Sequence, residues 1–234
     1  DSSNNQGIIQ EITFLTGVDT AQYTLEDRTR HVNEGYNRVA HLIIQSDGSM
    51  SWDDTNYSSY PVATTDIVKD QGNYDLFANA PEDLKNWLVL ERIDIEDEDG
   101  NGYKLHSFDQ SEIDIAYKEF METNSIPRYF DYRGTIITLK PAPNYNRTDG
   151  LKIFFQRGPS YFSSTDTTKE PGFASIFHEY LPLYATYKWS LRTRTQDERL
   201  KRDIQEMERA IQKHYSRRNV TDKKQVKRKF NQFK

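Results

Sequence analysis

The sequence predicts an α+β protein: a helical bundle made from the N- and C-terminal segments, an inserted antiparallel β-rich domain, and an extended C-terminal tail. Three observations support this fold class. Apolar residues recur at helical spacing near both ends of the chain, they alternate at a period of two through its middle, and basic residues dominate the last stretch. We therefore divide the chain into an N-terminal helical hairpin (1–48), an inserted β-rich domain (49–165), C-terminal helices of the bundle (166–216) and a basic tail (217–234).

Two helices are expected before the β-rich region. Residues 7–16 form a short helix that stops at Gly17, and a longer helix follows Thr24, whose hydroxyl can cap the free amides of the first turn. The longer helix ends at Asp47-Gly48, and the two helices form an antiparallel hairpin. One apolar stripe with a 4-3-4 spacing runs along it, formed by Val32, Tyr36, Val39 and Ile43.

Short strands separated by glycine-bearing turns are expected in the middle of the chain. The predicted strands are residues 62–68, 73–76, 88–95, 103–108, 128–132, 135–139 and 150–156. Turns are predicted at Gln71-Gly72, within the polar loop 96–102 and at Arg133-Gly134. Residues 110–121 break this pattern, because their apolar residues have helical spacing, and they predict a short helix against the sheet.

Two further helices are expected after the strands. The first begins near Ala174 and contains Pro182, so a kink or a loosened turn is predicted there. The second begins near Asp197, and its apolar stripe consists of Leu200, Ile204, Met207 and Ile211. The polar run SSTDTTKEPG (163–172) is interpreted as a spacer between the β-rich domain and these helices.

The composition excludes several classes of protein. The chain has no cysteine, so disulfide frameworks, thiolate metal sites and cysteine nucleophiles are excluded. No apolar run approaches the roughly 18 residues of a membrane span, and the N-terminus lacks the features of a signal peptide, so we expect a soluble protein that stays where it is made. Charge is unevenly distributed: residues 50–120 have 17 Asp/Glu and 5 Lys/Arg, whereas residues 216–234 have 8 Lys/Arg and 1 Asp.

Two apparent metal motifs fail on inspection. The loop that begins at Asp97 places oxygens at positions 1, 3 and 5 and glycine at position 6 of a calcium loop, but position 12 is Phe108, so a hairpin turn is the better interpretation. His178-Glu179 resembles the start of a helical zinc-protease motif, but Pro182 stands where the second histidine belongs. With no nucleophile elbow and no phosphate loop either, we predict no catalytic residue, no metal and no cofactor.

The basic tail is compatible with three roles. It can bind phosphates of nucleic acid, remain a solvated terminus, or fold on an acidic partner with its phenylalanines as anchors. The overall acidity of the chain (net charge −5) favours docking on a protein over nucleic-acid binding. The candidate docking residues are basic or aromatic and are Arg217, Arg218, Lys223, Lys224, Lys227, Arg228, Lys229, Phe230 and Phe233.

Four stretches together resemble a known family. They are WDDTNYSSYPVATTDIVKDQGNYDL (52–76), PRYFDYRGTIITLKPAPN (127–144), GLKIFFQRGPSYF (150–162) and TKEPGFASIFHEYLPLYATYKW (168–189). In this order and spacing they resemble the head-to-tail adaptor proteins of tailed bacteriophages, also called connector or head-completion ring proteins. The resemblance spans nearly the whole chain.

This resemblance implies a structural role in the virion neck, between capsid and tail, after assembly in the host cytoplasm. It implies a homo-oligomeric ring, commonly dodecameric, that docks under the portal protein, extends the DNA channel and forms the platform for a downstream tail or neck protein. Such proteins act in genome packaging and DNA ejection; DNA passes through without sequence-specific binding, and no membrane or enzymatic activity is involved. The C-terminal extension of such proteins often docks on the portal, which here corresponds to residues 217–234.

Two other classes of function stay open at this point. The β-rich domain, with its many tyrosines, can instead be a binding module that recognises a glycan or a protein. An enzyme of unrecognised type is the third possibility, and the absence of any acid–base or nucleophile constellation makes it the weakest.

Overall fold

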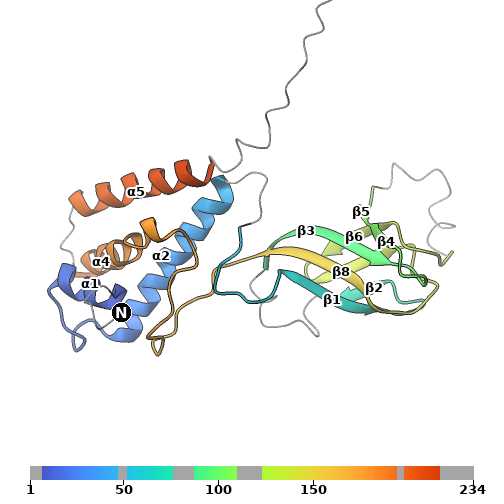
Figure 1. The fold of residues 1–234 in the computed structure, drawn as a ribbon, viewed down its shortest axis with the longest axis horizontal. Coiled ribbons are helices and arrows are strands. Elements are labelled where there is room, and N and C mark those ends of the chain that lie inside the picture. Colours follow the sequence, from blue (N-terminus) through green and yellow to red (C-terminus); the bar gives the residue numbers. More distant parts are fainter. Residues whose placement is uncertain (1–6, 47–51, 76–86, 110–122, 194–197, 217–234) are drawn as a thin grey trace, which may run out of the picture. The chain divides into compact units, whose positions relative to one another are not determined.

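The computed structural model describes residues 7–46, 52–75, 87–109, 123–193 and 198–216, which form two compact units. The helical unit comprises residues 1–58 and 159–234, and the β unit comprises residues 59–158 (Figure 1). The chain thus leaves the helical unit once and returns to it once, as the predicted α+β fold with an inserted β-rich part requires. The predicted helix at 110–121 and the tail at 217–234 lie outside the described residues.

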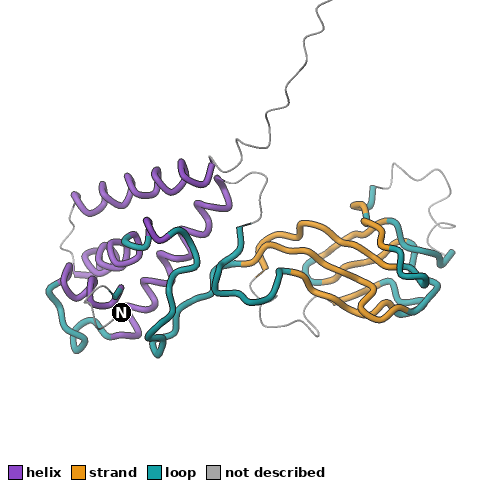
Figure 2. Tube along the Cα trace, viewed as in Figure 1, coloured by secondary structure: helices purple, strands orange, loops and turns teal. Residues whose placement is uncertain are grey.

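The helical unit contains four described α-helices and one 3-10 turn (Figure 2). They are α1 (Ile8–Thr16), α2 (Leu25–Ser46), η3 (Ser175–Phe177), α4 (Tyr180–Thr193) and α5 (Glu198–Ser216). The predicted end of the first helix and the predicted start of the second are confirmed, whereas the predicted end of the second helix at Asp47-Gly48 lies outside the described residues. Gly17 takes a left-handed conformation (φ +65°) and donates its backbone N–H to the Thr13 carbonyl, while the Thr24 hydroxyl accepts the N–H of Asp27.

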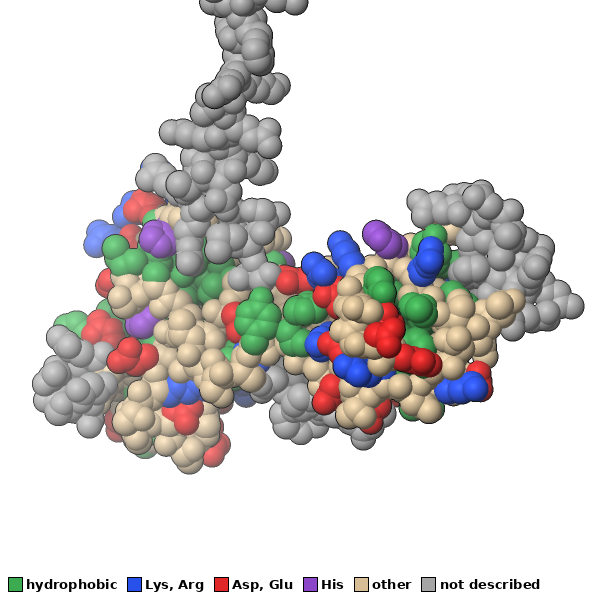
Figure 3. Space-filling model, turned by 45° about the vertical axis from the view of Figure 1, so that its right-hand side comes forward, with side chains coloured by type: hydrophobic (Ala, Val, Ile, Leu, Met, Phe, Trp, Pro, Cys, Tyr) green, Lys and Arg blue, Asp and Glu red, His purple; other side chains and the backbone are tan. Residues whose placement is uncertain are grey.

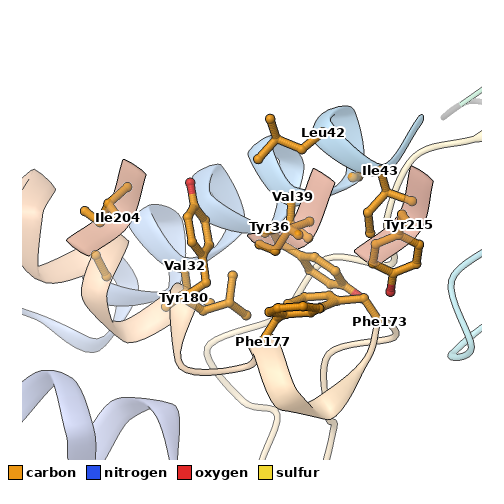
Figure 4. Packing of buried hydrophobic residues seen from close by; sticks show 14 of the residues in the cluster. Val32, Tyr36, Val39, Leu42, Ile43, Phe173, Phe177, Tyr180, Ile204 and Tyr215 are labelled. Carbon is orange, nitrogen blue, oxygen red and sulfur yellow. The ribbon is translucent and has the colours of Figure 1, made fainter. Parts of the chain in front are cut away.

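Helix α2 is the centre of the helical core, with α4 and α5 packed against it (Figure 4). The predicted stripe of Val32, Tyr36, Val39 and Ile43 is buried throughout its length. From α4 and α5, Leu181, Ile204, Ile211 and Tyr215 are buried in the same cluster. Burying one such side chain contributes about 2 kcal/mol, so the two amphipathic patterns account for much of the stability of this unit.

The start of α4 differs from the prediction. A single helix from Ala174 was expected, but the chain forms the 3-10 turn η3 first, and α4 begins only at Tyr180. Pro182 therefore lies in the first turn of α4, where a backbone N–H has no intrahelical acceptor, so the proline fits without breaking the helix. The expected kink is replaced by a change of helix type before the proline.

The described residues of the β unit form two four-stranded sheets, with strand orders β1-β8-β3-β4 and β2-β7-β6-β5. The strands are β1 (Val62–Ile67), β2 (Asn73–Asp75), β3 (Trp87–Glu96), β4 (Gly102–Lys104), β5 (His106–Ser107), β6 (Tyr129–Arg133), β7 (Ile136–Lys140) and β8 (Arg147–Arg157). All pairs are antiparallel except β5 with β6. The predicted alternation in β8 is confirmed, because Leu151, Ile153 and Phe155 all point into a core to which both sheets contribute.

In two places the alternation of apolar residues does not predict which strands pair. β1 and β2, separated by a short loop at Gln71-Gly72, pair with different strands in different sheets. The expected strand 103–108 is divided: β4 pairs with β3, Leu105 is buried, and β5 pairs with β6. The predicted hairpin across residues 96–102 is confirmed, since β3 and β4 are antiparallel.

A tyrosine–histidine pair, with Tyr23 buried and His31 half-buried, joins α2 to α4. Tyr23 stacks on Trp189, with ring centroids 4.4 Å apart, and its hydroxyl lies 2.6 Å from His31 Nδ1. Burial lowers the pKa of His31, and this effect outweighs the neighbouring Glu34 carboxylate, which favours protonation.

We expect His31 to make the protein less stable in mild acid. Its pKa is lower in the folded than in the unfolded chain, so the unfolded chain binds more protons below the ordinary histidine pKa of about 6.5. The contribution of His31 to the free energy of unfolding is therefore fully present above that pH and is lost as the pH falls below it. Chemical denaturation at pH values of about 7.5 and 5.5 measures the free energy of unfolding. Between these two pH values the wild type should lose more of it than His31→Gln does. Equal losses would contradict this assignment.

Candidate interaction surfaces

A buried carboxylate holds the points where the chain leaves and re-enters the helical unit. Asp54, 2% exposed, accepts a hydrogen bond from the Tyr36 hydroxyl on α2. The same carboxylate accepts the backbone N–H groups of Asn56 (2.9 Å) and Ser160 (2.8 Å). Since residue 56 precedes the β unit and residue 160 follows it, Asp54 ties both crossing segments to α2. We call this group the Asp54 clamp.

Gly172 completes the Asp54 clamp. Its backbone N–H donates to the Tyr36 hydroxyl, so that hydroxyl bridges Gly172 and Asp54. Burial, followed by the Asp54 carboxylate, raises the pKa of Tyr36 well above its ordinary value, so the hydroxyl stays a donor. A Cβ at Gly172 would lie 1.7 Å from Asp54 Oδ1, which means that only glycine fits here.

The polar run 163–172 is not a spacer between the units but an ordered loop of the helical unit. At its start, Asn33 of α2 exchanges two hydrogen bonds with the Phe162 backbone (2.8 and 2.9 Å). Lys169 Nζ returns to the Ser160 hydroxyl at 2.9 Å. These contacts satisfy the backbone of a segment without regular structure, which is why a polar run can pack here.

An open groove of about 540 Å³ lies between α2 and this loop. Its walls carry both signs of charge and amide groups, and the lining residues are Glu26, Thr29, Arg30, Asn33, Glu34, Asn37, Tyr161 and Ser164. Because the groove is open and not enclosed, it suits contact with another protein surface better than the capture of a small molecule.

The predicted docking residues, Arg217 to Phe233, lie outside the described part of the chain, so their role stays a prediction. The helix that precedes them is firmly held. Glu208 of α5 accepts two hydrogen bonds from Arg38 (2.9 and 3.2 Å) and one from the Tyr180 hydroxyl (3.0 Å). These bonds lower the pKa of Glu208 against the opposing effect of burial. The segment 217–234 therefore follows a fixed helix end.

The acidic loop 97–102 is a hairpin turn, as predicted. Asp97 accepts the Asn101 backbone N–H and the Tyr103 hydroxyl, both at 2.8 Å, and the Asn101 bonds lower the pKa of Asp97. The side chain therefore stabilises its own turn. Among the described residues, no group of three or more metal-ligating side chains lies close together, and His178 Nε2 bonds to the Phe173 carbonyl.

The acidity of residues 50–120 is partly neutralised by later strands. Glu96 on β3 accepts hydrogen bonds from Arg147 and Lys152 on β8, and these two bonds lower the pKa of Glu96. Figure 3 shows acidic and basic side chains interspersed over the displayed face of the β unit. This compensation joins residues that lie far apart in the sequence, so the local charge count could not show it.

Comparison with known proteins decides the family. The family model described as SU10 adaptor protein matches residues 6–228, nearly the whole chain. The chain belongs to this family. The predicted resemblance to phage head-to-tail adaptors is thereby confirmed, and the adaptor has a structural role in the phage particle. A comparison with curated proteins gave no match. None of the adaptor's described helices is long and apolar enough to cross a membrane.

The Asp54 clamp was missed by sequence reasoning. Its members lie in three of the stretches that carry the family resemblance and in α2, but their hydrogen bonds join residues up to 136 positions apart. The signal that was present is local: Asp54 and Asn56 have the spacing of a side chain that bonds its own backbone two residues on.

Proposed function

We propose that the adaptor forms a ring in the virion neck, docks under the portal protein and extends the DNA channel toward the tail. The match of the SU10 adaptor family over residues 6–228 carries this proposal. The architecture supports it, because one firmly packed helical unit can form the body of a ring while the inserted β unit remains available to a downstream tail or neck protein.

The C-terminal segment is the proposed portal contact. Helix α5 is held by Glu208 and by its buried stripe, so it presents residues 217–234 from a fixed point. This segment carries eight basic residues and one aspartate, with Phe230 and Phe233 as apolar anchors. An acidic surface on the portal would attract the segment by charge, and the two phenylalanines would add specific contacts.

Cutting the chain after Arg218 is expected to abolish portal docking while leaving the fold intact, because the helical core ends at Tyr215. Binding to purified portal should weaken by roughly a hundredfold or more, since both charge attraction and aromatic anchors are lost. A full-length variant with Phe230→Ala and Phe233→Ala keeps all the charge and should lose part of this affinity. The docking idea fails if truncated adaptor still joins DNA-filled heads and makes them tail-competent at the normal rate.

Electron microscopy of negatively stained samples tests the ring itself. The adaptor is imaged alone and after mixing with portal. Both samples are needed because an adaptor that is monomeric by itself can still assemble into a ring on the portal. Rings in the mixed sample support the proposal. Monomers in both samples, together with a soluble ligand bound by the β unit, would favour the alternative of a binding module.

A further inference from the structure

Helix α1 has apolar side chains on two faces, and only one of them is covered. Ile8 and Ile12 pack into the helical core, whereas Phe14 is 80% exposed and its neighbour Leu15 is 38% exposed. A short helix that is apolar on both faces is typical of a buried position. The uncovered face therefore indicates a further contact in the assembled protein.

The surroundings of Phe14 are acidic. Residues 7–27 include four carboxylates, Glu11, Asp19, Glu26 and Asp27, and no lysine or arginine. Asp27 is paired with Arg30 and Arg192, and the cation of Arg28, which bonds to Thr13, is buried. The remaining charges of residues 7–27 are the carboxylates of Glu11, Asp19 and Glu26. We call residues 10–26, which include Phe14, surface A.

A second exposed apolar side chain lies on a different part of the helical unit. Ile176 on the turn η3 is 74% exposed. Two contacts fix this turn to the end of α5: the rings of Phe177 and His214 are 5.3 Å apart, and the Ala174 N–H donates to the Tyr215 hydroxyl at 3.1 Å. Ile176 is thus held rigidly beside the last turns of α5.

The end of α5 beside Ile176 has the opposite charge. Residues 209–216 include Arg209 and Lys213, both exposed and one helical turn apart, and no carboxylate. Residues 174–178 have no charged side chain, and the exposed Glu179 follows them. We call η3 with its flanks (174–178) and the end of α5 (209–216) surface B.

Surfaces A and B lie near opposite ends of α2. Arg28, at the start of α2, contacts Thr13 of α1, whereas Tyr215 and Phe173 lie next to Ile43 near its other end (Figure 4). A contact of surface A with another surface A would bring carboxylates together. A contact of surface A with surface B pairs carboxylates with cations around two apolar side chains.

We propose that surface A of one adaptor copy docks on surface B of the next. The contact is head-to-tail, and each copy retains one free A and one free B, so repetition generates a closed ring when the rotation closes. Phe14 and Ile176 form the apolar centre of the contact, and the charges on both sides form its rim. This inference rests on the proposed ring and specifies how its subunits are joined.

The test uses two full-length variants, Phe14→Asp and Ile176→Asp. Both side chains are exposed, so both variants should fold like the wild type by circular dichroism. Each places a charge at the apolar centre and should raise the concentration needed for assembly roughly tenfold or more, alone or on portal, as measured by light scattering and microscopy. Tyr60→Asp, at a residue of the β unit that is 77% exposed, is the matched control and should assemble normally.

Mixing the two variants distinguishes head-to-tail from symmetric contacts. Phe14→Asp keeps an intact surface B and Ile176→Asp keeps an intact surface A, so an equal mixture should form heterodimers that cannot grow further. Normal rings from both variants, or no heterodimer in the mixture, would overturn the A-to-B contact while leaving the ring proposal standing. Wild-type adaptor that fails to assemble even on portal would instead overturn the ring.

Discussion

Arg28→Met should destabilise the adaptor by about 4 kcal/mol, a large share of the stability of a domain this size. Arg28 is fully buried at the start of α2, and its guanidinium donates to four groups. The acceptors are the carbonyls of Tyr23, Ile9 and Val18 and the hydroxyl of Thr13. Methionine fills a similar volume but leaves these oxygens buried without their donor, which releases α1 and the following loop from α2.

Arg30→Met is the matched control. Arg30 is two residues away on the same helix, but it is exposed and pairs with Asp27 at the surface, so its replacement should cost less than about 1 kcal/mol. Urea denaturation followed by far-UV circular dichroism measures both. Arg28→Lys should behave more like methionine than like arginine, because one ammonium cannot reach acceptors that lie in several directions. Equal stabilities of the Arg28 and Arg30 variants would contradict the role given to the buried guanidinium.

The helices were predictable because their information is local. Ile43 and Val39 on α2 and Ile204 and Ile211 on α5 belong to stripes that can bury themselves only as helices, and their positions match the structure. Arg28 falls one turn before Val32 on the same buried stripe. A charged residue in register with an apolar stripe is a signal of a buried polar contact that the sequence does contain.

The strand partners were less predictable because pairing is decided by the shared core. The loop between β1 and β2 is short enough for a hairpin, yet Ala63 pairs with Ile153 and Tyr74 with Ile137 in another sheet. Leu105 interrupts one expected strand because its side chain is needed in the core, which moves the backbone from one sheet toward the other. Alternation identifies strands, but it does not identify their neighbours.

The candidate surfaces depend on exposure, which the sequence does not reveal. Phe14 and Ile12 are equally good core residues by composition, and only the packing of α1 leaves Phe14 outside and Ile12 inside. The same holds for Ile176, which differs from the buried Phe177 by one position on the turn η3. Apolar residues that folding leaves uncovered are the positions at which an assembling protein and a monomer differ most.

Gly172→Ala is expected to cost about 3 kcal/mol, because the Asp54 clamp leaves no room for a methyl group. The added Cβ would lie 1.7 Å from Asp54 Oδ1, 2.5 Å from its Cγ and 2.7 Å from the Thr55 backbone nitrogen. Asp54 cannot swing away without giving up the Tyr36 hydroxyl and the N–H groups of Asn56 and Ser160. The variant must either strain the backbone or leave buried donors without an acceptor, and both are costly.

Gly102→Ala separates this contact from the general effect of replacing glycine. Gly102 begins β4, and a Cβ there meets no atom within 4 Å, so its replacement should change stability by less than about 1 kcal/mol. Urea denaturation of the two variants gives the comparison. Since the clamp holds residues 54–56 and 160 to α2, Gly172→Ala should also speed proteolysis of the two segments that connect the helical unit to the β unit. If Gly172→Ala were as stable as Gly102→Ala, the clamp would not hold the crossing segments, and the close approach of Gly172 to Asp54 would have no energetic consequence.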